Sequence, residues 1–304
     1  MALDRKKLNE ASRYFNTLAK DCTMCAQNCH VNREKRRGFC GQGTSAKITN
    51  AVLHFGEEPP LVGERGAGAI FFVGCGMRCV YCQNFAFSQL NYGREVSSKE
   101  LGEIFLKLQK SGATTLDLVT PEPHLHSILE ALIYGQKNGL SLPIVFNTSS
   151  YVNVETLKQL DGIVDVYLAD IRYTNDALAM KYSHVPDYWE KCKRALREMY
   201  RQVGAFKSER MHGLIVRHMV LPNGISGTQM ALRFIAEELS TSVPISLMSQ
   251  YFPVYKARNI SELARKINEE EYSNALKMVE EYGLSGWFQP LDEERNGVYA
   301  KTIG

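Results

Sequence analysis

The chain has 304 residues, of which 44% are hydrophobic and 23% are charged, and this composition is ordinary for a globular protein with a full core. No apolar run approaches the ~20 residues that a membrane-spanning helix needs. A net charge of +3 is too small to indicate a nucleic-acid partner, so we expect neither a membrane nor a nucleic acid as partner.

The cysteine content bears on the compartment. The segment Met1–Lys7 is polar and does not resemble the charged-then-apolar start of a secretory signal. Eight cysteines in such a chain favour metal sites in a reducing compartment over disulfide bonds. The sequence therefore predicts a cytoplasmic protein.

The first 60 residues differ from the rest of the chain. A predicted helix, Arg5–Ala19, precedes four cysteines with the spacing C-x2-C-x3-C-x10-C: Cys22, Cys25, Cys29 and Cys40. Four thiolates can close a tetrahedral zinc site or hold an auxiliary Fe–S cluster, and the spacing does not decide between them. Reduced thiols without metal, or a thiol with a role in the chemistry, are the alternatives. The short basic run Asn32–Arg37 is interpreted as a solvated loop.

The turn-rich segment Gly56–Pro60 marks the predicted boundary between two regions. Residues 1–60 would form an N-terminal helix and a Cys-rich metal-binding module. Residues 61–304 would form the main domain with a C-terminal extension, whose tail Arg295–Lys301 shows no usable periodicity.

Strand and helix patterns alternate along the main domain. The predicted strands are apolar and rich in β-branched or aromatic residues: Ala69–Val73, Thr114–Val119, Pro143–Asn147, Val164–Ala169, Leu214–Leu221 and Pro244–Gln250. One predicted helix starts at Ser97, which with Glu100 forms a capping box. The other predicted helices cover Leu125–Lys137, Asn153–Leu160, Tyr188–Gln202, Thr228–Glu238 and Glu269–Glu281.

This alternation predicts an α/β fold built from parallel βαβ units. Six such strands suggest an open, partial (β/α)6 barrel. Active sites of parallel barrels collect at the C-terminal ends of the strands. The first predicted strand of the main domain leads, at that end, into the most informative segment of the chain.

That segment carries three cysteines in a tight loop, Cys75, Cys79 and Cys82, with Tyr81 just before the third. A cubane [4Fe-4S] cluster normally takes four thiolates, so three on one loop leave one iron open for chemistry. Zinc favours closed four-ligand sites, and a lone buried cysteine is usually a small hydrophobe. Three cysteines in eight residues after a strand and a glycine favour the cluster.

The spacing C-x3-C-x2-C with an aromatic before the third cysteine resembles the signature of the radical S-adenosylmethionine (SAM) superfamily. The segment Cys75–Asn84 is similar to the pyruvate formate-lyase activating enzyme branch. Residues 20 to 285 resemble, more closely, a subgroup of that branch with an N-terminal four-cysteine motif. Further matching segments are Leu118–Pro121, Phe146–Tyr151, Asp161–Asp170 and Leu247–Tyr251.

The resemblance implies a partial radical SAM barrel and an oxidoreductase that works anaerobically. It implies that the protein cleaves SAM reductively at a [4Fe-4S] cluster to a 5'-deoxyadenosyl radical, which abstracts hydrogen from a polypeptide, the glycine of a glycyl-radical enzyme being one such target. No side chain need act as a catalytic acid or base, because the cofactor carries the chemistry. A flavodoxin or ferredoxin electron donor is implied as partner. Radical SAM chemistry on a small metabolite or another peptide, and a non-catalytic Fe–S or zinc redox or binding module, are the alternatives.

The same resemblance assigns a SAM site to residues at predicted strand ends: Tyr81, Glu122, Asn147, Ser149, Asp170, Arg172 and His218. Glu122 lies in Val119–Pro123, which takes the place of the family's Gly-Gly-Glu-Pro segment without its paired glycines. Its carboxylate would meet the SAM ammonium group, and a solvated loop glutamate is the alternative. Asn147 and Ser149 would contact the methionine or ribose, or else form a turn and helix cap.

The last three residues of this set also have structural alternatives. Arg172 would pair with the SAM carboxylate and Asp170 with an amine or ribose, or the two would pair with each other. Arg217 and His218 point to opposite faces of their strand, so only one faces the pocket. By resemblance His218 would lie near the adenosine, and a hydrogen-bonded core histidine is the competing interpretation.

Overall fold

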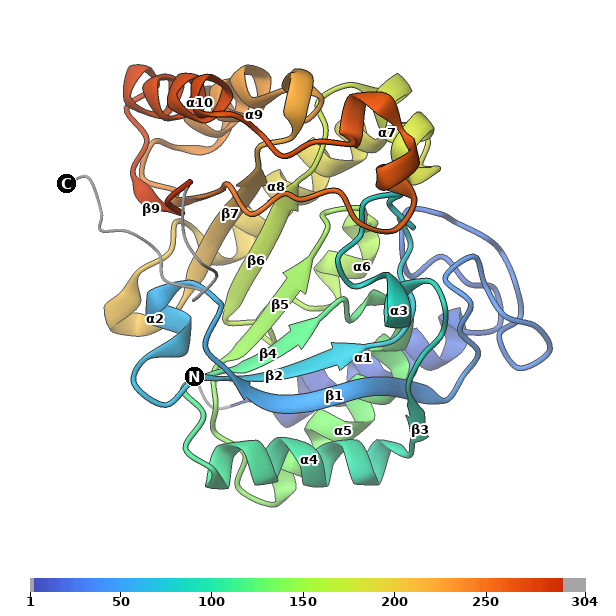
Figure 1. Cartoon of the computed structure of the whole chain (residues 1–304). Coiled ribbons are helices and arrows are strands. Elements are labelled where there is room, and N and C mark those ends of the chain that lie inside the picture. The colour runs from blue at the N-terminus through green and yellow to red at the C-terminus, as the bar shows by residue number, and fades with distance from the viewer. Residues whose placement is uncertain (1–2, 292–304) are drawn as a thin grey trace.

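The computed structural model describes residues 3–291 (Figure 1). In these residues one sheet of nine strands has the order β3-β1-β2-β4-β5-β6-β7-β8-β9. The strands are β1 (Ala46–His54), β2 (Ala67–Phe72), β3 (Arg94–Val96), β4 (Leu116–Val119), β5 (Ile144–Thr148), β6 (Val166–Ile171), β7 (Gly213–Met219), β8 (Ile245–Met248) and β9 (Gly286–Phe288).

All strand pairs from β2 through β9 are parallel, and only β1 pairs in the antiparallel sense, with β2 and β3. The six predicted strands are present as β2 and β4 to β8. Within the described part of the chain β3 and β9 end the sheet without pairing to each other, so the barrel is open. The predicted α/β fold with a partial barrel is confirmed.

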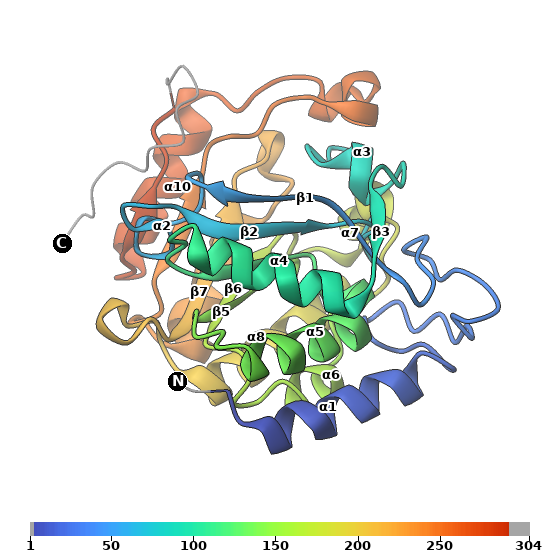
Figure 2. The same cartoon turned by 90° about the horizontal axis from the view of Figure 1, so that it is seen from below.

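Helices cover the outer face of the sheet (Figures 1 and 2). The helices of residues 3–291 are α1 (Arg5–Leu18), α2 (Pro59–Val62), α3 (Phe85–Ser88), α4 (Ser98–Lys110), α5 (Leu125–Lys137), α6 (Val154–Lys158), α7 (Asp176–Ser183), α8 (Tyr188–Val203), α9 (Thr228–Phe234) and α10 (Glu269–Glu281). Short 3-10 turns are η1 (Glu122–His124), η2 (Ser208–Arg210), η3 (Pro222–Gly224), η5 (Tyr255–Asn259) and η6 (Ser261–Leu263), and η4 (Ile235–Leu239) is a π-helix. None of the helices in residues 3–291 has the length and apolar character to cross a membrane.

Local sequence signals explain several helix boundaries. Ser97 accepts a hydrogen bond from the backbone N–H of Glu100, whose side chain accepts from the backbone of Ser97, so the predicted capping box begins α4. Asn268 and Glu271 form the same box at α10. The predicted helix 228–238 is present as α9, but its last turn widens into η4.

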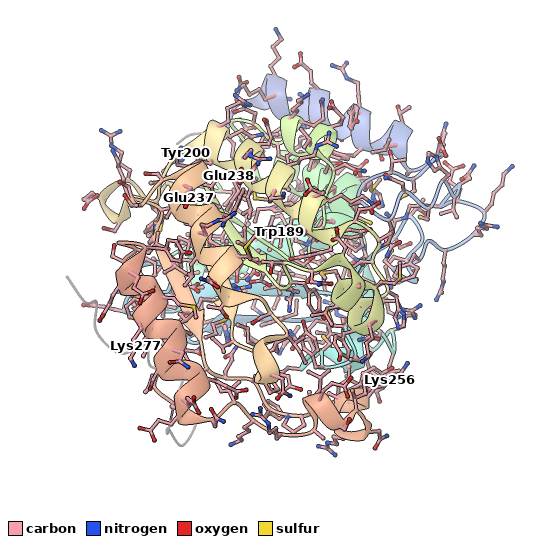
Figure 3. All side chains as sticks on the ribbon, turned by 90° about the horizontal axis from the view of Figure 1, so that it is seen from above. Trp189, Tyr200, Glu237, Glu238, Lys256 and Lys277 are labelled. Carbon is pink, nitrogen blue, oxygen red and sulfur yellow. The ribbon has the colours of Figure 1, made fainter. Side chains whose placement is uncertain are left out.

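The outer layer packs through large side chains. Trp189 of α8 meets Phe234 of α9 edge to face with 5.3 Å between ring centroids, and Arg197 of α8 pairs with Glu238 of η4. Figure 3 labels Trp189 and Glu238 on these neighbouring helices. This layer buries the sheet's outer face and keeps the strand ends in register around the inner face.

Inside the barrel a small apolar cluster closes one end. Leu61 of α2 packs there against the first halves of the strands, on Val145, Val166, Leu168 and Ile215. The hydroxyl of Thr115 donates to the backbone oxygen of Leu61 at 3.0 Å. Because this cluster fills one end of the barrel, a functional site can form at the other end, where the C-terminal ends of the strands lie.

The N-terminal region contributes to this same sheet. Strand β1 lies before the predicted boundary at residues 56–60 yet pairs with β2 along its length. Between α1 and β1, residues 19–45 form loops and turns without a helix or strand. The tail 295–301 lies outside the described residues.

Candidate functional site

The loop that follows β2 is shaped by two residues in the left-handed region. Gly74 has φ 89°, and a Cβ on it would lie 2.7 Å from the backbone oxygen of Cys40, so only glycine fits. Arg78 has φ 56° and turns the chain again. As a result Cys75, Cys79 and Cys82 line one cavity.

The three thiols influence one another. Burial raises the pKa of each, that of Cys75 to about 11, and the negative charge of a neighbouring thiolate raises it further. The Arg172 guanidinium opposes this effect at Cys79 and Cys82. Three thiolates that raise one another's pKa need positive charge beside them, which the iron of a cluster would supply.

The arrangement fits a cluster better than a single ion. Within residues 3–291 no three His, Cys, Asp or Glu side chains surround a point suited to one metal ion. A [4Fe-4S] cluster makes a different demand, because each thiolate binds a separate iron. Three neighbouring thiols facing one cavity meet that demand and leave the fourth iron without a thiolate from this loop.

The cavity has a volume of about 480 Å³ and lies at the C-terminal ends of the parallel strands. That volume is in the range of small-molecule sites. The structure brings five of the seven predicted SAM-site residues to its walls: Tyr81, Asn147, Ser149, Asp170 and Arg172. Asp170 accepts a hydrogen bond from Arg172 at 2.6 Å, so the ion pair that we considered as the alternative is present.

A second arginine organises the deep wall of the cavity. Arg217 donates to Asp170 at 2.7 Å, to Glu57 at 3.0 Å and to Asn147 at 2.6 Å. The sequence did not indicate a role for Glu57, because the acidic and proline-rich segment Gly56–Pro60 is typical of a linker. Nothing local to that segment shows that its carboxylate meets an arginine on β7.

Comparisons with known proteins identify the family. Residues 69–205 match the family model of the radical SAM superfamily. MJ0674, an uncharacterized protein of Methanocaldococcus jannaschii, is 35% identical over 275 residues, covering 87% of this chain and 76% of the relative. The chain belongs to the radical SAM superfamily.

Two further similarities are more distant. MJ0808, another uncharacterized protein of Methanocaldococcus jannaschii, is 22% identical over 278 residues, covering 82% of this chain and 78% of the relative. The crystal structure of methylornithine synthase (PylB) is 15% identical with a TM-score of 0.47, covering 93% of this chain and 75% of that one. Membership in the superfamily implies a [4Fe-4S] cluster and SAM, which the cysteine loop and its cavity fit.

Glu122 lies below the radical SAM cysteine loop. Its side chain is buried and accepts a hydrogen bond from the hydroxyl of Thr148. Burial raises the pKa of Glu122 to about 7, and the thiols of Cys25 and Cys75 interact with its charge. The structure does not place Glu122 among the residues lining the cavity, so its contact with SAM stays a prediction.

His218 is also outside the cavity lining. Its ring is fully buried and hydrogen-bonds to the backbone oxygen of Ile171 at 2.9 Å and to the hydroxyl of Thr228 at 3.0 Å. Burial lowers the pKa of His218 to about 4, so the ring is neutral. Of the two neighbouring residues, Arg217 lines the cavity.

The segment Val119–Pro123, which takes the place of the family's Gly-Gly-Glu-Pro segment, has at Thr120 a backbone conformation typical of glycine. Thr120 lines the cavity with φ 59°, in the left-handed region that a β-branched residue seldom adopts. Its backbone N–H donates to the oxygen of Asn147 at 2.9 Å, which holds the turn in place. Threonine therefore follows a path for which glycine is the natural residue.

At the floor of the barrel, where Glu57 lines the cavity, three carboxyl groups lie near one cation, Arg217. Glu57, Glu58 and Asp117 are each less than a tenth exposed. Burial raises the pKa of all three, that of Glu58 to about 7, while Arg217 opposes the shift in each case. The barrel floor therefore holds more acid groups than one arginine can neutralise.

The four N-terminal cysteines lie in a module that contacts the loop of Cys75, Cys79 and Cys82. The Sγ atoms of Cys29 and Cys40 lie 3.2 and 3.7 Å from the position that a Cβ on Gly38 would take. Burial raises the pKa of Cys22, Cys25 and Cys40, and each of these groups interacts with another thiol of the set. The structure brings the predicted four-cysteine set together.

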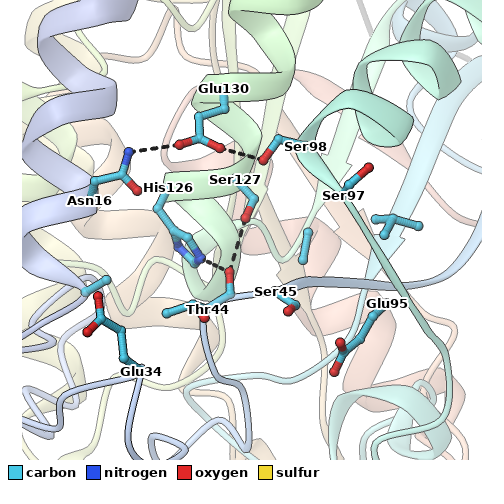
Figure 4. A pocket seen from close by; sticks show the side chains of 13 residues that line it. Asn16, Glu34, Thr44, Ser45, Glu95, Ser97, Ser98, His126, Ser127 and Glu130 are labelled. Carbon is cyan, nitrogen blue, oxygen red and sulfur yellow. Dashed lines mark hydrogen bonds between the residues drawn. The ribbon is translucent and has the colours of Figure 1, made fainter.

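A surface hollow beside this module shows how it is attached to the barrel (Figure 4). His126 and Ser127 of α5 hydrogen-bond to the backbone oxygen of Thr44. Glu130 accepts from Asn16 of α1 at 3.0 Å and from Ser98 of α4 at 2.6 Å. Apart from the Nδ1 of His126, which has no partner in residues 3–291, these side chains are hydrogen-bonded to one another or to Thr44, so we interpret the hollow as an anchoring point.

Proposed function

We propose that this chain reductively cleaves SAM at a [4Fe-4S] cluster held by Cys75, Cys79 and Cys82 and abstracts hydrogen from a polypeptide, the glycine of a glycyl-radical enzyme being the expected target. The observation that carries the proposal is that three thiols from one loop face a cavity with both acidic and basic side chains on its walls. The bound cluster supplies the electron that breaks the SAM sulfonium bond. The protein's side chains bind and orient SAM and keep water away.

The charges of the cavity match the amino-acid part of SAM. Asp170 would receive the ammonium group and Arg172 the carboxylate, by opening the ion pair that they form with each other. Asn147 and Ser149 would bind the ribose hydroxyls or the methionine part. Tyr81 lines the cavity as well, and its ring packs edge to face on Tyr251 with 5.9 Å between centroids.

Features of the cavity rim support a polypeptide substrate. The rim carries the exposed amide side chains of Gln83, Asn84 and Gln250, which can hydrogen-bond to a peptide backbone. Just beyond α3, Leu90 is 56% exposed and Tyr92 is 74% exposed. Such exposed apolar side chains beside a polar rim are typical of protein interaction sites.

The test is anaerobic reconstitution with iron and sulfide, followed by SAM and dithionite. We expect 5'-deoxyadenosine and methionine, and we expect Cys79→Ala to abolish both. Cys192→Ala is the matched control, because Cys192 is a buried thiol on α8 outside the loop. Wild-type levels of 5'-deoxyadenosine from Cys79→Ala would refute the proposal.

A small cationic metabolite is a second candidate substrate, favoured by the barrel floor. Glu57 lines the cavity above Glu58 and Asp117, and an amine reaching this depth would neutralise their excess charge. Deuterium-labelled amines and labelled glycyl-radical enzymes can be compared as donors. Transfer of deuterium into 5'-deoxyadenosine identifies which class is the substrate.

We also propose that Cys22, Cys25, Cys29 and Cys40 hold a second metal centre. The interactions between their thiols support this assignment, and an Fe–S cluster fits better than zinc, because within residues 3–291 no three such side chains surround a point suited to a single ion. Iron, sulfide and zinc can be quantified in a triple variant with Cys75→Ala, Cys79→Ala and Cys82→Ala. A variant that retains neither iron nor zinc would show that the module binds no metal.

A further inference from the structure

The two cysteine segments touch at several points. The Sγ of Cys25 lies 3.2 Å from where a Cβ on Gly76 would be, and Gly76 is the neighbour of Cys75. The side chain of Gln27 donates to the backbone oxygen of Gly76 at 2.9 Å. The module therefore contacts the loop of Cys75, Cys79 and Cys82 directly, one residue from Cys75.

A second line of contacts runs beside the first. Gly74 lies so close to Cys40 that a Cβ on Gly74 would be 2.7 Å from the backbone oxygen of Cys40. The guanidinium of Arg78, next to Cys79, lies over the ring of Phe39, next to Cys40, at 5.3 Å from its centroid. A cation over an aromatic ring is a stabilising contact. Both sides of the cysteine loop are thus packed on the module.

The outer side of the module is basic. Lys35, Arg36 and Arg37 form an exposed run, here called the basic loop, and none of them pairs with a carboxylate of residues 3–291. It borders a hollow of about 290 Å³ whose other charged residues are Arg33, Lys47, Glu34 and Glu95. Basic groups outnumber acidic ones there by five to two.

The basic loop lies next to the thiols of Cys29 and Cys40. Arg37 precedes Gly38, whose backbone lies against the sulfurs of Cys29 and Cys40. A protein bound on the basic loop would therefore lie next to Gly38, which contacts the sulfurs of two of the module's cysteines. Cys40 also lies against Gly74, next to Cys75, so the module lies between the basic loop and the loop that carries the three cysteines of the cavity.

We propose that the module is the electron input site of this protein. An Fe–S cluster on Cys22, Cys25, Cys29 and Cys40 would pass single electrons from an acidic one-electron carrier, docked on the basic loop, to the cluster on Cys75, Cys79 and Cys82. The carrier loses one electron, the catalytic cluster gains it, and the module returns to its starting state without a bond made or broken. This inference rests on the proposed function.

The inference commits to iron, because zinc has no redox chemistry in proteins and could not pass an electron. It also commits to an acidic carrier, because opposite charges on two surfaces raise the association rate and fix the docking orientation. Both commitments can fail independently of SAM cleavage.

The first experiment uses the full-length reconstituted protein and a flavodoxin kept reduced by its reductase. In Arg36→Glu/Arg37→Glu we expect kcat/KM for flavodoxin-driven 5'-deoxyadenosine formation to fall about tenfold or more. With dithionite the rate should stay at the wild-type value. Arg5→Glu/Lys6→Glu is the matched control, since these exposed residues begin α1 at its far end from the module and carry the same charge change.

The second experiment does not depend on SAM. In the variant lacking Cys75, Cys79 and Cys82, the module's iron absorption should bleach on mixing with reduced flavodoxin. Adding Arg36→Glu/Arg37→Glu should slow that bleaching about tenfold or more. Zinc in place of iron, or a bleaching rate indifferent to the charge change, would overturn the inference.

The outcomes separate this inference from the proposed function. If the module is reduced in a charge-dependent way but no SAM is cleaved with either reductant, the electron input site stands and the proposed function fails. If SAM is cleaved and the charge variant loses no flavodoxin-driven activity, the proposed function stands and the input site is wrong.

Discussion

The two cysteine segments of this protein lie in contact but are held in place differently. The loop from Cys75 to Cys82 is positioned by β2 and surrounded by buried charges, with Asp170 and two arginines on the cavity wall. The module of residues 19–45 has no helix or strand and is held mainly by hydrogen bonds to its backbone from other elements, among them the amide of Asn153 and the Nζ of Lys191. Charge pairing fixes the first region, and backbone anchoring fixes the second.

The largest expected effect tests the charged region. Asp170→Ala leaves Arg172 and Arg217 without their shared carboxylate, and removing one partner of a buried pair costs about 3–5 kcal/mol of unfolding free energy. Denaturant unfolding measures it. The control is Asp161→Ala, whose partner Arg201 is exposed, with an expected cost below about 1 kcal/mol. Equal losses in the two variants would mean that buried charge does not fix this region.

The barrel floor gives a pH-dependent effect of somewhat smaller size. Burial raises the pKa of Glu58 from 4.5 to about 7, so the folded state binds the proton more tightly than the unfolded chain. This contribution to stability is present at low pH and is lost as the pH rises through about 7.

Glu58→Gln removes that dependence. Between about pH 5 and about pH 8 the variant should gain about 3 kcal/mol of unfolding free energy relative to the wild type. Denaturant unfolding over the pH series checks this, with the exposed Glu237→Gln (labelled in Figure 3) as the control. A difference that does not change with pH would show that Glu58 is ionised throughout.

The module should respond to the loss of a single amide. The side-chain nitrogen of Asn153 donates to the backbone oxygens of Thr23 at 2.6 Å and Cys25 at 3.1 Å, and to the side chain of Asn28 at 2.7 Å. Asn153→Ala should cost about 2 kcal/mol, since the two hydrogens of the amide supply two hydrogen bonds at a time and each net hydrogen bond contributes about 1.

The change should be local to the module. We expect faster proteolysis within residues 19–45 and weaker metal retention there, while iron on the Cys75 loop stays bound. Asn138→Ala is the control, because that exposed side chain caps only the oxygen of Tyr134. Global unfolding without preferential cleavage in the module would contradict backbone anchoring.

The same contrast explains what could be predicted from the sequence. Periodicity and capping are local, and the helices Leu125–Lys137 and Glu269–Glu281 were predicted with the bounds that the structure has. Strand β1 was missed because polar residues interrupt its apolar pattern and it pairs in the antiparallel sense, and β9 has only three residues.

The candidate site divides in the same way. Three cysteines in eight residues are a local signal, so the loop could be predicted. The burial of Glu57 and Glu58 depends on Arg217, about 160 residues later in the chain, and no neighbouring residue indicates it. Contacts between distant charged residues are what the sequence did not show.

The smallest expected effect concerns backbone strain beside the cavity. In the module the left-handed positions Asn28 and His30 are residue types that tolerate this region, whereas Thr120 at φ 59° is β-branched and does not. Relieving such strain is worth about 1–2 kcal/mol, part of which the greater freedom of unfolded glycine offsets. Thr120→Gly should therefore stabilise the protein by up to about 1 kcal/mol in denaturant unfolding. Thr156→Gly, in the helix α6 and bonded to the oxygen of Met24, should destabilise it. If both variants lose stability alike, the turn at Thr120 is not strained, and the absence of the family's glycine there is without cost.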